Sequence, residues 1–93
     1  MSNVPIDLST LKQTVIAVLR RTAPEVSAAE LDPARPLRDQ VDLDSIDWLN
    51  FLVGLHERLG VDIPEADYAK LVTLTNVLDY LAAKLEASAA ARG

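Results

Sequence analysis

VDLDSIDWLNFLVGLHERLGVDIPEADYAKLVTLTNVLDYL, residues 41–81, contains most of the helix signals in this chain. Asp44 and Ser45 are residue types that cap or open a helix, and Gly60 is a type that ends one. Between them the apolar side chains recur at helical spacing, so the pattern predicts a helix over residues 45–59. The positions that carry this spacing are Ile46, Leu49, Leu52, Leu55 and Leu59.

The segments on both sides of this helix complete an all-α prediction. Downstream, Pro64 suits the first turn of a short third helix over residues 65–71, and Thr73 can cap a fourth helix that reaches roughly residue 87. Upstream, apolar spacing predicts a first helix over residues 8–22, and the three prolines of residues 23–43 predict a long ordered loop. The expected fold is a small four-helix bundle with three long helices, one short third helix and a long loop between helices 1 and 2.

Only 4% of the residues are aromatic, so we expect a core built from aliphatic side chains. The apolar stripes of the second and fourth helices should converge in this core, because each stripe must be buried against another element. The positions that we expect to be largely buried are Leu49, Leu52, Leu55, Leu59, Ile63, Leu78 and Leu81.

The length of 93 residues suits one small domain. We expect it over residues 1–93, with a core at about residues 8–87 and a frayed tail at residues 88–93. The absence of cysteine excludes disulfides and thiolate metal sites. The first residues show no signal-peptide pattern, and no stretch reaches the roughly 20 apolar residues that span a bilayer. We therefore expect a cytoplasmic protein without a membrane span.

The negative charge is concentrated in the middle of the chain. Residues 42–67 contain seven acidic residues and one basic residue, whereas the rest of the chain is close to balanced. Such a segment repels nucleic acid and attracts basic protein surfaces, although a solvated surface has the same composition. A helix-turn-helix DNA-binding protein is disfavoured, because its recognition helix would be this acidic one.

Asp44-Ser45-Ile46 stands at the predicted start of the second helix, and Ile63-Pro64-Glu65 follows its predicted end. Further along the chain come Leu71, Thr73 and Val77-Leu78-Asp79-Tyr80-Leu81. In this arrangement the chain resembles the acyl carrier protein family, whose attachment signature is Asp-Ser-Leu at the start of its second helix. The likeness runs without gaps across Asp42–Leu81, with isoleucine in place of the leucine.

This resemblance implies a carrier function without catalysis. A phosphopantetheinyl transferase would move 4′-phosphopantetheine from coenzyme A onto the hydroxyl of Ser45, and the thiol of that arm would hold acyl groups as thioesters. Asp44 would cap the helix and help the transferase recognise the site. The free N–H groups and the dipole of a helix N-terminus favour the charge of the phosphodiester. The further partners implied are acyl-loading and acyl-transfer enzymes with basic docking surfaces.

Some residues of the second helix depart from the family pattern. Asn50 stands where an acid is common, and Trp48 replaces a residue that is usually small or polar. The candidate residues for partner recognition are Ile46, Asp47, Trp48 and Asn50, and the departures suggest a specialised, free-standing carrier with dedicated partners. Trp48 shares a face with Ser45 and fits two roles, docking to a partner or folding over the adjacent loop in a partly buried position.

Gly54 and His56 also lie in this helix. Gly54 interrupts the helix pattern and either permits close packing or leaves space for an acyl chain. His56 is the only histidine, and about 16 Å of helix separates it from Ser45, which is too far for a general base. The sequence shows no paired acid and base and no nucleophile constellation, so an enzyme is the least expected class.

Three functions stay open on the sequence. The first is an acyl carrier for fatty-acid, lipid or polyketide-type biosynthesis, in which the core residues would also form the acyl pocket. The second is the peptidyl carrier domain of nonribosomal peptide synthesis, which shares the fold and the attachment logic. The third is an unmodified helical interaction protein with the same fold. In each case we expect a monomer without a metal site or a nucleic-acid partner.

Overall fold

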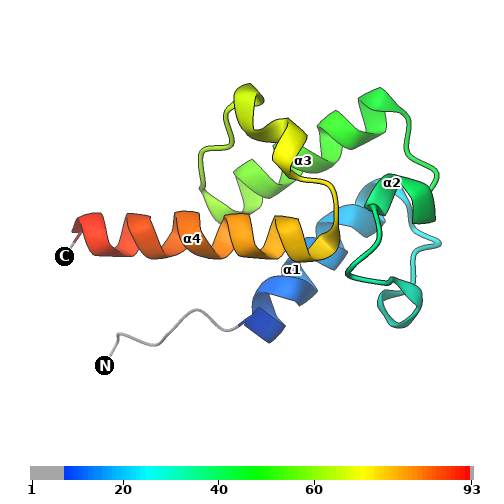
Figure 1. The fold of residues 1–93 in the computed structure, drawn as a ribbon, viewed down its shortest axis with the longest axis horizontal. Helices are drawn as coiled ribbons and strands as arrows, with labels where there is room; N and C mark the ends of the chain where they lie inside the picture. The colour runs from blue at the N-terminus through cyan, green and yellow to red at the C-terminus, as the bar shows by residue number, and fades with distance from the viewer. Residues whose placement is uncertain (1–7, 93) are drawn as a thin grey trace.

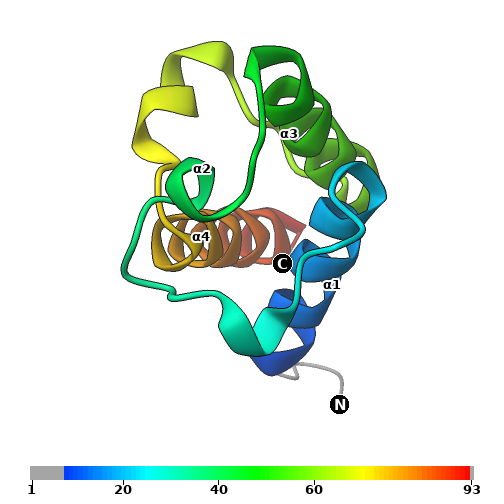
Figure 2. The same cartoon turned by 90° about the vertical axis from the view of Figure 1, so that its right-hand side faces the viewer.

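Three long helices form the frame of the molecule (Figure 1). The computed structural model describes residues 8–92, in which the long helices are α1 (Leu8–Thr22), α3 (Ser45–Leu59) and α4 (Leu74–Arg92). α1 packs against both α3 and α4, and Figure 2 shows the three helices with α4 viewed along its axis. The described residues contain no strand, which confirms the all-α prediction.

Three short helical segments connect the long helices: η1 (Ala28–Glu30), α2 (Leu37–Gln40) and η2 (Glu65–Lys70). η2 is the predicted short third helix, and it is a 3-10 helix rather than an α-helix. η1 and α2 lie within the predicted loop, where segments of three and four residues are too short to show a periodicity. None of the described helices is both long and apolar enough to cross a bilayer.

The ends of the long helices follow from local residue chemistry. α4 begins with a reciprocal cap, because Thr73 Oγ1 accepts from the N–H of Asn76 and Asn76 Oδ1 accepts from the N–H of Thr73, each at 3.0 Å. α3 ends at Gly60, whose φ of 67° is a left-handed conformation that glycine adopts at little cost. α4 continues to Arg92, past the predicted end near residue 87, since its last residues are rich in alanine. Gly93, the end of the predicted tail, lies outside the described residues.

Hydrogen bonds hold the long loop between α1 and α3 in place. The side-chain amide of Gln40 donates to the carbonyls of Asp32 at 2.9 Å and Arg35 at 3.0 Å, and its oxygen accepts from the N–H of Asp32 at 2.7 Å. The N–H of Leu37 donates to the carbonyl of Val72 at 2.9 Å. The loop is therefore ordered, as predicted, and α2 is joined to the segment between η2 and α4.

The core is aliphatic, as predicted, with Phe51 as its one buried aromatic side chain within the described range. Leu59 and Leu78 are only partly buried but pack against it. The prediction was wrong for Leu49, which is 45% exposed because the side of α3 that faces the core centres on Phe51 and its neighbours. The predicted core positions that are buried are Leu52, Leu55, Ile63 and Leu81.

Gly54 lies where α3 packs against α1. A Cβ atom added at this glycine would meet Cγ1 of Val18 at 2.8 Å, closer than van der Waals contact allows. Val18 is buried, so most of its side chain is already packed, although a surface hollow of about 270 Å³ borders both residues. Of the two interpretations of Gly54, the structure supports close helix packing, which fixes how α3 sits on the bundle.

Candidate functional site

Ser45 is the first residue of α3, and its side chain is exposed. Asp44 immediately precedes it and caps the helix, as predicted, because its Oδ1 accepts a hydrogen bond from the N–H of Asp47 at 2.8 Å. The carbonyl of Asp44 accepts the next bond, from the N–H of Trp48 at 2.9 Å. The cap holds the first turn in helical form and leaves the Ser45 hydroxyl accessible to another protein.

The groups at the start of α3 have opposing effects on an anion bound there. The helix dipole and the unpaired N–H groups of the first turn favour a negative charge next to Ser45. The carboxylates of Asp44 and Asp47 lie in the same turn and repel an anion, and one amide is already occupied by the cap. These residues therefore fit a phosphodiester that is covalently attached to Ser45 better than they fit a free anion.

An exposed apolar face runs along α3 from this site. Ile46 is 68% exposed, Leu49 45% and Val53 41%, and the spacing of three and four residues puts them on one side of the helix. Asn50 is also exposed, and Asp47 is half-buried. The predicted recognition residues Ile46 and Asn50 thus face outward, and sequence analysis missed the contribution of Leu49 and Val53 to the same face, although their spacing from Ile46 signalled it.

Trp48 packs against the helix bundle and is only partly exposed to solvent. It is half-buried, packs against the core and has its ring centroid 5.2 Å from that of Phe51, with an angle of 39° between the ring planes. It lines a groove of about 190 Å³ together with Tyr68 and Val72. The structure therefore supports the role of Trp48 as a partly buried side chain over an adjacent loop.

His56 makes a structural contact at the opposite end of α3. Its Nδ1 donates to the carbonyl of Val61 at 2.5 Å, and since a carbonyl can only accept, this contact assigns the proton to Nδ1. The N–H of Gly60 donates back to the carbonyl of His56 at 2.9 Å. His56 thus closes the turn that follows α3.

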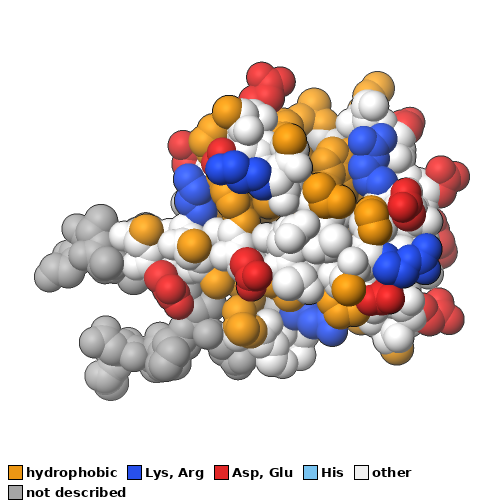
Figure 3. Space-filling view, viewed as in Figure 1, with side chains coloured by type: hydrophobic (Ala, Val, Ile, Leu, Met, Phe, Trp, Pro, Cys, Tyr) orange, Lys and Arg blue, Asp and Glu red, His pale blue; other side chains and the backbone are white. Residues whose placement is uncertain are grey.

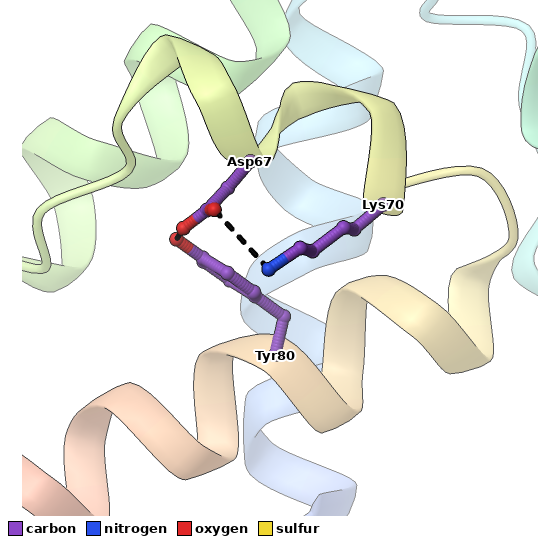
Figure 4. Close-up of polar contacts among 3 residues, drawn as sticks. All are labelled: Asp67, Lys70 and Tyr80. Atoms are coloured by element: carbon purple, nitrogen blue, oxygen red, sulfur yellow. Dashed lines mark hydrogen bonds and ion pairs between the residues drawn. The ribbon is translucent and has the colours of Figure 1, made fainter.

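A polar cluster joins η2 to α4 (Figure 4). The hydroxyl of Tyr80 donates to Oδ2 of Asp67 at 2.5 Å, and Nζ of Lys70 lies 3.3 Å from Oδ1 of the same carboxylate. The hydrogen bond from Tyr80 lowers the pKa of Asp67 against the opposing effect of partial burial, and Lys70 lowers it further. Burial and the bond to Asp67 raise the pKa of Tyr80. Sequence analysis missed this pair, because no local pattern links residues in different elements.

The predicted acyl-pocket residues meet a hollow between α3 and η2. Leu52 and Ile63 line it, together with Val53, Tyr68 and the polar His56 and Asp62, and its volume is about 150 Å³. η2 has no buried residue of its own, and it packs against the core through the partly buried Tyr68. Leu55 and Leu81 lie deeper, in the core cluster, and Leu49 lies outside it. The structure thus brings together part of the predicted set at one opening.

Comparison with known proteins adds a match over most of this fold. A family model of the phosphopantetheine attachment site matches residues 9–81, from α1 into α4. The acyl carrier protein of Myxococcus xanthus is 27% identical over 73 residues, which cover 75% of this chain and 92% of the relative.

Two relatives share slightly more identity. The meromycolate extension acyl carrier protein of Mycolicibacterium aurum is 32% identical over 73 residues, 75% of each chain. The protein of the same name from Mycolicibacterium smegmatis is 31% identical over 77 residues, 80% of this chain and 78% of the relative. With the exposed serine at the capped start of α3 and the family match over residues 9–81, the chain belongs to the acyl carrier protein family, whose cofactor is 4′-phosphopantetheine.

Proposed function

We propose that Ser45 carries the 4′-phosphopantetheine arm and that the protein holds acyl intermediates on it as thioesters. The observation that carries this proposal is the position of Ser45, exposed as the first residue of α3 within the matched range. The capped helix start keeps the hydroxyl at a fixed, accessible point. Asp44 then has two roles, as the cap and as a recognition residue for the phosphopantetheinyl transferase.

The enzymes served are those of fatty-acid, lipid or polyketide-type biosynthesis, in the cytoplasm. The names of the two meromycolate extension relatives favour the lipid branch among these. The protein acts as a monomer and as a substrate of its partners, with no catalytic residue of its own. A peptidyl carrier would attach its cargo in the same way, and identification of the thioester-bound group on protein from native cells separates the two.

The partner surface is the outward face of α3 next to Ser45. Ile46 and Leu49 supply exposed apolar area, and Asp47 supplies a carboxylate for a basic docking surface. A solvent-exposed ion pair contributes only about 0–1 kcal/mol, so apolar burial against the partner has to supply much of the affinity. Asn50 lies on this face without charge and selects for partners that offer a hydrogen bond there rather than a further cation.

The carried chain is stored between α3 and η2. The hollow lined by Leu52, Val53 and Ile63 marks the entry, and the buried leucines beneath it form the apolar lining. The described residues have no buried polar or charged side chain, so an entering alkyl chain would leave no core side chain with an unmet hydrogen bond.

The attachment is tested by incubating the protein with coenzyme A and a broad-specificity phosphopantetheinyl transferase and measuring intact mass. The wild-type protein should gain the mass of one arm, and Ser45→Ala should gain none. Ser27→Ala is the matched control, since Ser27 is an exposed loop serine that should not affect labelling. Labelling that persists in Ser45→Ala, or a wild-type protein that stays unmodified, would overturn the assignment; the second outcome would favour an unmodified interaction protein.

A further inference from the structure

The surface hollow beside Val18 and Gly54 is a groove between α1 and α3, two helices that lie side by side in Figure 2. Its volume is about 270 Å³. Val18 and Gly54 form its floor, because the first is buried and the second has no side chain. The exposed side chains of Arg21, Val53 and Glu57 border it.

This groove differs from the one lined by Trp48, and the two share no lining residue. The groove lined by Trp48 draws its walls from α2, α3, η2 and the segment after η2, and Figure 3 shows hydrophobic side chains gathered between η2 and α2. The groove between α1 and α3 therefore needs an occupant of its own.

The groove is continuous with the exposed apolar face of α3. Val53 lines the groove, is 41% exposed and stands on the same side of α3 as Ile46 and Leu49. The line from residue 46 to residue 53 is roughly 10 Å long, at 1.5 Å per residue. Ile46 directly follows Ser45, so a partner that reaches the serine and covers this apolar line also meets the groove.

The shape of the groove suits one large apolar side chain. At roughly 30 Å³ per water-sized group, its volume holds about nine such groups, enough for a leucine or phenylalanine side chain and part of the backbone that carries it. An amphipathic helix presents apolar side chains at intervals of three and four residues, which is also the spacing of the exposed line on α3. Such a helix can cover the line and place its last apolar side chain above Gly54.

The charges around the groove differ between its two walls. α1 contains Lys12, Arg20 and Arg21 and no acidic residue, whereas Asp47 and Glu57 lie on α3. Arg21 and Glu57 border the same groove, yet neither forms an ion pair among residues 8–92. Both charges are thus available to a partner, which has to present an acid toward α1 and a base toward α3.

We propose that this groove docks an amphipathic helix of a partner enzyme, with an apolar side chain above Gly54 and a carboxylate paired with Arg21. The inference rests on the partner surface proposed on α3 and extends that surface onto α1. It adds a requirement opposite in sign to that of Asp47, because a partner with a wholly basic surface would be repelled by Arg21. Arg21 is therefore a residue that selects among partners.

A display library of helical peptides with randomised surface charges tests this proposal. It is selected in parallel on the wild-type protein and on Arg21→Glu. Peptides enriched on the wild type should combine apolar residues at helical spacing with an acid at one fixed position, and on Arg21→Glu that position should change to lysine or arginine. A peptide selected on the wild type should bind Arg21→Glu about ten-fold more weakly, and its binding should shift the amide NMR signals of Thr22 and Gly54.

Arg20→Glu is the matched control, since it makes the same charge change at a neighbouring exposed arginine that does not line the groove. It should keep the affinity of the wild type to within about two-fold. Peptides with the same charges on both selected proteins, or no enriched helices at all, would overturn the proposal.

Two further outcomes locate a failure. Binding that is lost in Leu49→Ser but unchanged in Arg21→Glu would retain the α3 surface and overturn its extension onto α1. Self-association of the wild type, seen by light scattering and abolished by Arg21→Glu, would assign the groove to a second copy of the chain instead. The mass gain at Ser45 is measured without these peptides, so attachment and docking fail in distinguishable ways.

Discussion

Gly54→Ala should destabilise the protein, although alanine is the better helix former. In the middle of a helix, replacing glycine by alanine gains about 1 kcal/mol. Here the new Cβ would meet Cγ1 of Val18 at 2.8 Å, and overpacking of this kind costs about 1–3 kcal/mol. Val18 is β-branched and buried, so few rotamers are open to it. The net loss should be about 1 kcal/mol, which lowers the melting temperature of a domain of this size by about 4–8 °C.

Urea unfolding of four proteins measures this contact: the wild type, Gly54→Ala, Val18→Ala and the double variant. Val18→Ala removes the methyl group with which the new Cβ collides. In that background Gly54→Ala should therefore become neutral or stabilising, with a coupling energy of about 0.5–3 kcal/mol between the two sites. The coupling is the sharper measurement, because it cancels the helix propensity of alanine.

Asn50→Ala is the matched control on the same helix. Asn50 is exposed, so the substitution reports helix propensity without a packing change, and the stability should shift by no more than about 0.5 kcal/mol. The reasoning would be refuted by a Gly54→Ala protein that is about 1 kcal/mol more stable than its parent in both backgrounds. Helix propensity alone gives that result, and Gly54 would then leave spare volume instead of mediating the contact between α1 and α3.

Three further predictions concern the core, the surface charge and the contact between η2 and α4. Truncating Leu52 or Leu81 to alanine should cost about 2–5 kcal/mol, because both side chains are buried, and an unchanged urea midpoint would contradict this. Magnesium should raise the melting temperature by screening the repulsion between acidic side chains within residues 42–67. Sodium chloride at equal ionic strength should raise it by a similar amount, since residues 8–92 offer no group of three metal-ligating side chains. A melting temperature that stays flat or falls with added magnesium would contradict the prediction. Tyr80→Phe should destabilise the protein at neutral pH by removing the hydrogen bond that lowers the pKa of Asp67. The contribution of this hydrogen bond to the free energy of unfolding is present above the ordinary pKa of 3.8 and is lost as the pH falls through the lowered pKa of Asp67. The stabilities of the wild type and Tyr80→Phe should therefore converge in acid. A difference in stability that does not change with pH would exclude this role for the hydrogen bond.

The helices and the place of the candidate serine at a helix start could be predicted because their signals are local. The bounds of α1 and α3 follow from apolar spacing and from end residues such as Asp44 and Gly60, each of which acts within one turn. Thr73 caps α4 for the same reason. Ser45 was identified in the same way, as a hydroxyl at a helix start inside a family-like stretch, and the structure places it there, exposed.

Other features depend on how the helices meet, and for these the tertiary structure was needed. Leu49 belongs to the apolar stripe of α3 by spacing, yet it is exposed because the angle at which α3 packs on the bundle turns its neighbours inward instead. The bond from Tyr80 to Asp67 joins η2 and α4 across 13 residues, and the groove lined by Trp48 draws its walls from α2, α3, η2 and the segment after η2. Spacing along one helix constrains which residues share a face, but which face meets a neighbour is set by packing between elements distant in the chain.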